Sequence, residues 1–450
     1  MKPFLAALLL VPLALLAGYL STRFTPSILL WGSLAVAIFL VSFVKIEFGL
    51  YILIFSMLLS PEIIVGETRG ASLGRGVSLR FEDFLLVLIG LSWFARNAVI
   101  KELGLFRKTP LNKAIVVYII ACVLSTGFGV IAGTVSAKTG LFFVLKYIEY
   151  FIVFFMLVNH VETEEQVRRL VFFLFLTCFI VSAISILQIP TGGRVSAPFE
   201  GEVGEPNTFG GYLVFIGAIV GGLIMQEKWS NRKIAVILLA VVILPPLLFT
   251  QSRTSYLAAI AAIFTLAMFS SKRFIAITLV VAAMVLSPIL MPSTVMERIA
   301  FTFKQDRHAD QIEVGDIRLD TSTSARLRSW NRAFSDWIKK PVFGFGVTGR
   351  GFIDAQFPRV LAETGIVGLV AFIYLLYSVG QVAFSSLRQA RGRYFQGLTI
   401  GFIAGFVGMI VHSLGANTFI IVRIMEPFWF FVGIITVLPM IEKEAQLQET

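Results

Sequence analysis

Residues 397–415 read GLTIGFIAGFVGMIVHSLG, a run without lysine, arginine, aspartate or glutamate. A helix needs about 20 mainly apolar residues to cross the hydrocarbon core of a bilayer. Similar runs recur along the chain, and together they predict up to fourteen membrane-spanning helices. The predicted spans are 4–20, 27–44, 47–65, 82–100, 114–134, 139–160, 170–188, 208–227, 234–250, 254–271, 274–291, 360–384, 397–415 and 419–440.

The composition of the whole chain agrees with a membrane protein. Of its 450 residues 57% are hydrophobic and only 14% are charged, whereas about a quarter of the residues of an average soluble domain are charged. This composition excludes a soluble globular enzyme and a disordered chain. Cys122 and Cys178 both lie in apolar runs, which excludes a disulfide scaffold. We therefore expect an all-α polytopic membrane protein with about 12–14 transmembrane helices, forming a single domain over residues 1–450.

Lysines and arginines in the short loops predict the orientation. If the N-terminus is cytoplasmic, most of these residues fall on the cytoplasmic side, as the positive-inside rule requires. The net charge of +11 then reflects topology, and we expect no nucleic-acid partner. Both termini are predicted to be cytoplasmic. The first run, after Lys2, is read as a retained helix, with a signal peptide as the alternative.

A polar stretch over residues 292–358 separates the eleventh and twelfth predicted spans and is placed outside. Long loops without a core of their own are uncommon unless they carry function. We expect a large, helical extracytoplasmic cap here, with a helix in ARLRSWNRAFSDWIKK at 325–340. Its apolar face would hold Trp330, Ala333, Phe334, Trp337 and Ile338, as in a helix lying on a membrane surface.

Three arginines on the predicted outer side suggest an anion site. Arg326 falls at the centre of that apolar face, where a guanidinium needs an anionic partner, while Arg328 points away. Arg253 lies in FTQSRTSYL at a turn between two spans, and Arg194 lies in the loop PTGGRVSAPFE. Plainer alternatives are an interfacial anchor for Arg253 and a solvated loop charge for Arg194. Planar guanidinium groups suit phosphate oxygens.

Candidate general bases on the same side are Asp354, Glu363 and His412, each of which has a purely structural alternative as a hydrogen-bonding residue. Lys146 and Glu149, three residues apart in one span, are expected to neutralise each other. The sequence contains no phosphate-binding loop, HExxH pair or Cys/His metal spacing. We therefore expect neither a metal nor a cofactor.

Four local patterns suggest a family. They are Arg194 followed by EPNTFGGYL at 205–213, QSRTSYLAA at 251–259, RLRSW at 326–330 with KPVFGFGVTG at 340–349, and RVLAETGIVGL at 359–369. In this order the chain resembles the bacterial O-antigen ligase and O-antigen polymerase group of membrane glycosyltransferases, over residues 115 to 440. Ligases of that family have a histidine where Asp354 aligns.

The resemblance implies an enzyme of the bacterial cytoplasmic membrane with its active site on the outer face. The donor would be a glycan on a polyprenyl diphosphate, and the acceptor a hydroxyl of another glycan, a lipid or a protein, among membrane lipids. Arg253, Arg326 and Arg194 would bind the diphosphate. Asn207 and Trp330 would contact the acceptor or the glycan. Asp354 would be the base, with Glu363 or His412 as alternatives.

Two other classes of protein remain open. A secondary transporter or lipid-linked-sugar flippase would use the intramembrane residues Lys146, Glu149, Glu363 and Glu426 as a proton or substrate path. Transporters usually consist of repeated halves with broken helices, and no such repeat is visible in the sequence. A scaffold of a cell-envelope assembly, with arginines that bind only lipid head groups, is the third possibility.

Overall fold

The computed structural model describes residues 26–67, 76–100, 107–200, 204–290, 296, 311–314, 317–318, 321–351 and 353–449. The predicted span at 4–20 lies outside these residues. The helices are α2 (Pro26–Val44), α3 (Ile46–Leu59), α4 (Phe81–Ile100), α5 (Asn112–Ile131), α6 (Ala137–His160), α7 (Glu164–Ile186), α8 (Pro206–Gln226), α9 (Asn231–Phe249), α10 (Arg253–Phe269), α11 (Arg273–Leu290), α13 (Thr321–Lys339), α14 (Gln356–Gln389), α15 (Arg393–His412) and α16 (Val422–Glu449). The strands are β1 (Glu62–Glu67), β2 (Gly76–Arg80), β3 (Glu313–Val314) and β4 (Ile317–Arg318).

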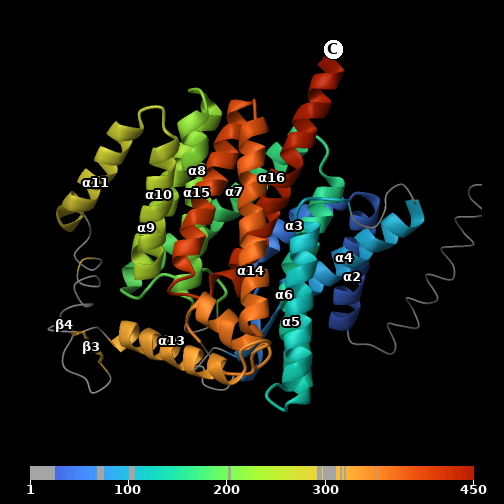
Figure 1. Cartoon of the computed structure of the whole chain (residues 1–450). Coiled ribbons are helices and arrows are strands. Elements are labelled where there is room, and N and C mark those ends of the chain that lie inside the picture. The colour runs from blue at the N-terminus through green and yellow to red at the C-terminus, as the bar shows by residue number, and fades with distance from the viewer. Residues whose placement is uncertain are drawn as a thin grey trace, which may run out of the picture.

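From α5 to α11, and again from α14 to α16, the helices run alternately up and down in one bundle (Figure 1). Helix α13 lies across the end of the bundle opposite to the C-terminus (Figure 1). Eight helices of the described residues are long and apolar enough to cross a membrane. Shorter apolar helical stretches of 10–17 residues lie in α2, α3, α10 and α11. The all-α, multi-pass membrane architecture predicted from the sequence is confirmed.

Each predicted span from 27–44 onward coincides with a helix, but the span at 47–65 is too long. Helix α3 ends at Leu59, and β1 and β2 form an antiparallel hairpin in its place. The reason is local: Ser60 precedes Pro61, and a residue before proline is disfavoured in the helical region. Ser60 is accordingly extended, with φ −78° and ψ 128°.

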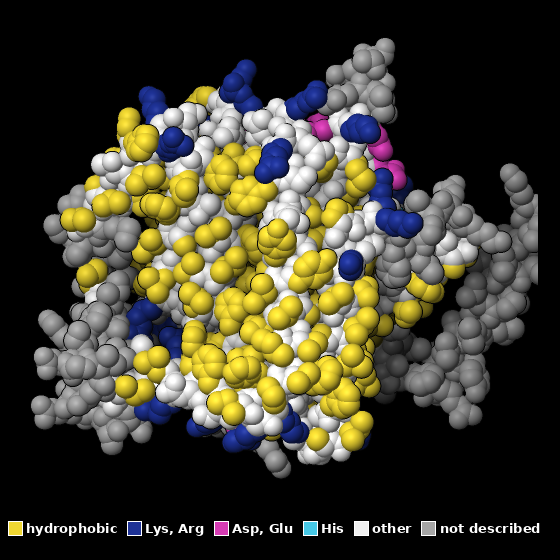
Figure 2. All heavy atoms as spheres, viewed as in Figure 1, with side chains coloured by type: hydrophobic (Ala, Val, Ile, Leu, Met, Phe, Trp, Pro, Cys, Tyr) yellow, Lys and Arg dark blue, Asp and Glu magenta, His cyan; other side chains and the backbone are white. Residues whose placement is uncertain are grey.

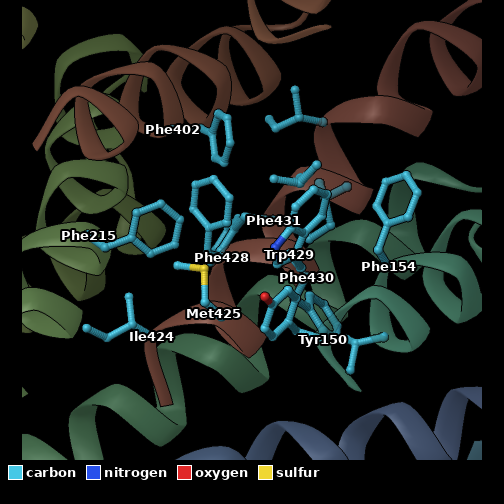
Figure 3. Packing of buried hydrophobic residues seen from close by; sticks show 14 of the residues in the cluster. Tyr150, Phe154, Phe215, Phe402, Ile424, Met425, Phe428, Trp429, Phe430 and Phe431 are labelled. Atoms are coloured by element: carbon cyan, nitrogen blue, oxygen red, sulfur yellow. The ribbon is translucent and has the colours of Figure 1, made fainter. Parts of the chain in front are cut away.

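The last helix, α16, forms the centre of the bundle. Its side chains Phe428 and Trp429 pack against α6, α8 and α15 (Figure 3). The ring of Phe428 lies 5.6 Å from that of Phe215 on α8, and the ring of Trp429 lies 4.7 Å from that of Phe151 on α6. Aromatic pairs at these separations add to the gain from apolar burial. This core fixes the ends of the surrounding helices, where the candidate site lies.

The surface of the bundle fits a lipid environment. Apolar side chains cover the middle of the face in Figure 2, and lysines and arginines gather toward its two ends. Ile131, Val44 and Val285 are examples of apolar side chains that are at least 69% exposed. A soluble protein rarely leaves apolar patches of this extent uncovered.

The segment between α13 and α14 folds back into the bundle. The Phe345 and Gly346 amides donate to the Ala362 and Glu363 carbonyls of α14, at 3.1 and 2.8 Å. Gly344 has a φ of 65°, and a Cβ atom there would lie 2.6 Å from both carbonyl oxygens. Gly365 has a φ of 64° and interrupts the regular helix of α14. The glycines of this segment thus permit a close backbone contact that holds the start of α14.

Candidate functional site

The ends of several helices meet at the end of the bundle where α13 lies (Figure 1). They are the N-terminus of α8, the N-terminus of α10, the C-terminus of α15 and the turn before α16. The start of α14 joins them: the Gln356 amide donates to the Ser413 carbonyl at 3.1 Å, and Asn417 Nδ2 donates to the Ile353 carbonyl at 2.8 Å. These bonds hold Asp354 next to the end of α15.

His412, the last residue of α15, is fully buried and connects three of these ends. Its Nε2 lies 3.3 Å from Ser255 Oγ on α10, and its Nδ1 lies 2.7 Å from Thr418 Oγ1 before α16. Ser255 Oγ donates to Ser252 Oγ at 2.8 Å. In this assignment Nε2 carries the proton and Nδ1 accepts from Thr418. Both ring nitrogens are therefore used within the protein.

Arg253 begins α10 and is half-buried. The preceding residue, Ser252, caps the helix by accepting from the Ser255 amide at 3.3 Å. A hydroxyl that accepts from a free amide of the first turn is the usual way to start a helix. The motif QSRTSYLAA therefore places an arginine at a helix N-terminus, where the backbone dipole also favours an anion.

Arg194, expected to bind the diphosphate, and Asn207, expected to contact the acceptor or the glycan, are hydrogen-bonded to each other. Arg194 Nη2 donates to Asn207 Oδ1 at 3.1 Å, and its Nε donates to the Thr250 carbonyl at 3.0 Å. Asn207 is in the first turn of α8, and Thr250 directly follows the last residue of α9, three residues before Arg253. The exposed Arg194 side chain thus joins the loop after α7 to the start of α8 and the turn that carries Arg253.

Arg326 faces inward from α13, toward an acidic side chain. Its Nε lies 3.5 Å from Asp354 Oδ2, and the two side chains are 20% and 33% exposed. Its charge also acts on the His412 ring. Arg328 is exposed, and Trp330, one turn after Arg326, is half-buried.

Only part of the apolar face predicted for this helix is covered by protein. Ala333 is buried against Ile353 and Ala362, but Phe334 and Ile338 are 44% and 71% exposed. The helix packs on α14 through small and polar side chains, with the large apolar ones outside. The exposed Phe334 and Ile338 side chains fit the expected helix on a membrane surface, where lipid would cover them.

Glu363 lies apart from the arginines. It is 2% exposed and accepts from Arg359 Nε at 3.0 Å, one turn earlier on α14. Its surroundings are Tyr147 and Cys122, on α6 and α5. The structure therefore brings Asp354, but not Glu363, next to Arg326. We call Arg194, Arg253, Arg326 and Asp354 the arginine site.

Sequence reasoning missed a second set of charges, which we call the buried charge network. It pairs Arg80 with Glu82 at 3.0 Å, Lys146 with Asp83 and with Glu149, the latter at 3.3 Å, and Arg423 with Glu200 at 3.5 Å. The predicted Lys146–Glu149 pair is confirmed. Burial raises the pKa of Glu200 to about 8, although the charge of Arg423 opposes this shift. Asp83 and Lys146, like Glu200 and Arg423, come from distant segments, so sequence spacing gave no signal for these two pairs.

Among the described residues, no group of three or more His, Cys, Asp or Glu side chains is placed to hold a metal ion. Residues 237–373 match the family model described as O-antigen ligase. A search of curated proteins finds no match. The family resemblance seen in the sequence motifs is confirmed for this stretch, which contains Arg253, Arg326 and Asp354 but neither Arg194 nor His412.

Proposed function

We propose that the O-antigen ligase domain of this multi-pass membrane protein transfers a glycan from a polyprenyl diphosphate to an acceptor hydroxyl. The reaction takes place on the outer face of the bacterial cytoplasmic membrane, and the arginine site is its centre. One observation carries the proposal: Arg326 of the cap helix meets Asp354. The start of α14 after Asp354 bonds to the end of α15, whose His412 contacts Ser255 in the first turn of α10, the helix that Arg253 begins.

The arginines bind the leaving group. In the transfer the acceptor oxygen bonds to the anomeric carbon, while the bond from that carbon to the diphosphate oxygen breaks. Negative charge grows on the diphosphate as it leaves. Arg253 and Arg326 offset this charge from fixed positions, and preorganised stabilisation of this kind typically contributes several kcal/mol. Arg194 holds Asn207 at the edge of the site, toward the glycan.

Asp354 takes the proton of the acceptor hydroxyl. It is one-third exposed and lies against Arg326, so acceptor and diphosphate meet at one place. His412 already uses both ring nitrogens, and Glu363 is buried against Arg359. These two residues hold the site together: His412 through α10 and the turn before α16, and Glu363 within α14.

The test is a transfer assay with purified protein in lipid vesicles. Given a polyprenyl-diphosphate glycan and an acceptor, the protein is expected to release polyprenyl diphosphate in step with the glycosylated product. A single addition would identify a ligase, and a ladder of products a polymerase. Movement of the intact donor across the vesicle membrane without release of polyprenyl diphosphate would contradict the proposal and favour a flippase.

Reporter fusions test the face of the membrane. A reporter fused after residue 390 should be active only in the cytoplasm, and one fused after residue 310 only outside. The basic loops between α8 and α9 and between α14 and α15 lie at the same end of the bundle as the C-terminus (Figure 1). The opposite reporter pattern would put the arginine site in the cytoplasm and rule out an outer-face enzyme.

A further inference from the structure

A cavity of about 440 Å³ lies at the opposite end of the bundle from the arginine site. It is formed where α3 and α7 begin and where α4 and α6 end, and no role in glycan transfer accounts for it. Its polar lining includes Lys45, Arg96, Asn97, Asn159, His160 and Glu162. By the predicted topology this end faces the cytoplasmic leaflet.

Two cations of this cavity have no acidic partner among the ion pairs of the described residues. Arg96 Nη1 donates to the Phe43 carbonyl at 3.1 Å and also to the Val44 carbonyl, at the end of α2. These are uncharged acceptors, so the guanidinium keeps its charge uncompensated. Lys45 is exposed at the junction of α2 and α3, directly before the first residue of α3.

A third polar group points to a missing ligand. His160 Nε2 is buried and has no hydrogen-bond partner among the residues that the structure describes, and the charge of Arg96 acts on the same ring. A buried polar atom without a partner costs free energy, so such atoms often mark a site that a ligand or ion completes. Of the two acids in the lining, Glu47 is already paired with Arg169 at 3.1 Å.

We propose that this cavity binds the phosphate group of an anionic phospholipid of the adjoining leaflet, through Lys45, Arg96 and His160. Phosphate oxygens accept from all three side chains. A lipid is favoured over a free anion because the cations stand where lipid-facing side chains end: Val44 precedes Lys45 and Val99 follows Arg96 by one turn, and both are 69% exposed. Basic pockets between helices at the cytoplasmic leaflet suit anionic head groups.

The experiment measures lipid binding to the purified full-length protein by native mass spectrometry and by thermal unfolding. Phosphatidylglycerol should bind and raise the unfolding temperature more than phosphatidylcholine does. Lys45→Gln and Arg96→Gln should each weaken phosphatidylglycerol binding about fivefold. Lys45→Gln is the safer variant, because Arg96 also holds the end of α2. Arg232→Gln, an exposed arginine in the first turn of α9, is the matched control and should change nothing.

Inorganic phosphate distinguishes the two sources of the anion. If phosphate alone stabilises the protein as well as phosphatidylglycerol does, and the same variants lose the effect, the ligand is a free anion and the lipid assignment is wrong. If the double variant Lys45→Gln with Arg96→Gln binds phosphatidylglycerol as tightly as the control, the cavity is not the site. Neither result bears on glycan transfer, which the opposite end of the bundle performs.

Discussion

The arginine site and the buried charge network lie at the same end of the bundle, but their cations differ in solvent exposure and in their acidic partners. In the network, Arg423 and Glu200 have side chains that are 1% and 2% exposed, and Lys146 lies between two carboxylates. In the arginine site, Arg326 is 20% exposed and its acidic partner Asp354 is 33% exposed. Ser252 and Thr254 flank Arg253 in the sequence, and Arg194 contacts Asn207 and Thr250.

This difference supports the proposal that the arginine site binds substrate and that the buried charge network holds the fold. A cation of the network cannot turn to a phosphate without leaving a carboxylate buried and unpaired, which is strongly unfavourable. Arg326 can do so, because Asp354 reaches water when the pair opens. We therefore expect cations that hold a fold and cations that bind a substrate to differ in the free energy needed to separate them from their carboxylate partners. The experiments below test this distinction.

The largest effect is expected at the inward arginine. Arg326→Ala should lower the transfer rate by about 10²–10³-fold, since a fixed group that offsets the leaving charge is lost. Lysine at this position should restore little, because it lacks the planar fork. Arg328→Ala, on the exposed side of α13, is the control and should be near wild type. An essential Arg328 with a dispensable Arg326 would refute the assignment of the inward face.

The next effect concerns the base. Asp354→Asn should lower the rate by about 10²–10⁴-fold, as expected for a lost general base, without a lower unfolding temperature. Asp354→His should retain part of the activity, as the histidine of related ligases implies. Initial rates with saturating donor measure both variants. If Asp354→Asn were near wild type while His412→Ala or Glu363→Gln were inactive, the base would be that residue.

The buried charge network should affect stability more than the reaction. Lys146→Met leaves Asp83 and Glu149 buried without their cation, and removing one partner of a buried pair typically costs about 3–5 kcal/mol. The unfolding temperature should fall clearly, while the activity of the folded fraction stays near wild type. Arg169→Met, which breaks two exposed pairs, is the control and should have a small effect. Loss of activity without loss of stability would place the network in the catalytic machinery.

A smaller effect is the pH dependence contributed by Glu200. Its pKa in the folded protein is about 8, above the ordinary value of 4.5. Between these values the folded protein holds a proton that the unfolded chain releases, so stability falls as the pH rises through this window. Thermal unfolding from pH 5 to pH 8.5 should show this decline, and Glu200→Gln should flatten it. A rise in stability over the same range would contradict the assignment.

The smallest effect is expected from a chelator. The described residues of the arginine site offer one carboxylate and no cluster of metal-binding side chains. Transfer by the purified protein should therefore continue at an unchanged rate in excess EDTA. A rate that falls in EDTA and returns with added magnesium would show that the diphosphate is bound with a metal ion.

The sequence predicted the membrane helices well, because about 20 apolar residues in a row leave a bilayer-spanning helix as the main solution. It also predicted that Arg326 and Arg328 point to different sides of α13, since helical spacing fixes which side chains share a face. It predicted the apolar stripe with Phe334 and Ile338, but apolar character alone does not determine which part of a stripe meets protein and which meets lipid.

Pairs formed across the fold left no comparable signal. Arg194 and Asn207 are thirteen residues apart and joined by a loop, and Ser255 and His412 are 157 residues apart. Glu363 is a charge inside a predicted span, and its partner Arg359 lies one turn earlier on the same helix. Spacing within a single helix would have revealed that pair. The buried charge network required the tertiary structure.

The most direct test of the central claim is the binding of polyprenyl diphosphate to purified protein. If the arginine site and not the buried charge network holds the diphosphate, Arg326→Ala should bind it about tenfold more weakly or worse, given the usual strength of charge-assisted hydrogen bonds. Lys146→Met, compared at a temperature where it is folded, should bind it as the wild type does. Equal binding by Arg326→Ala and the wild type, with binding lost in Lys146→Met, would contradict the claim.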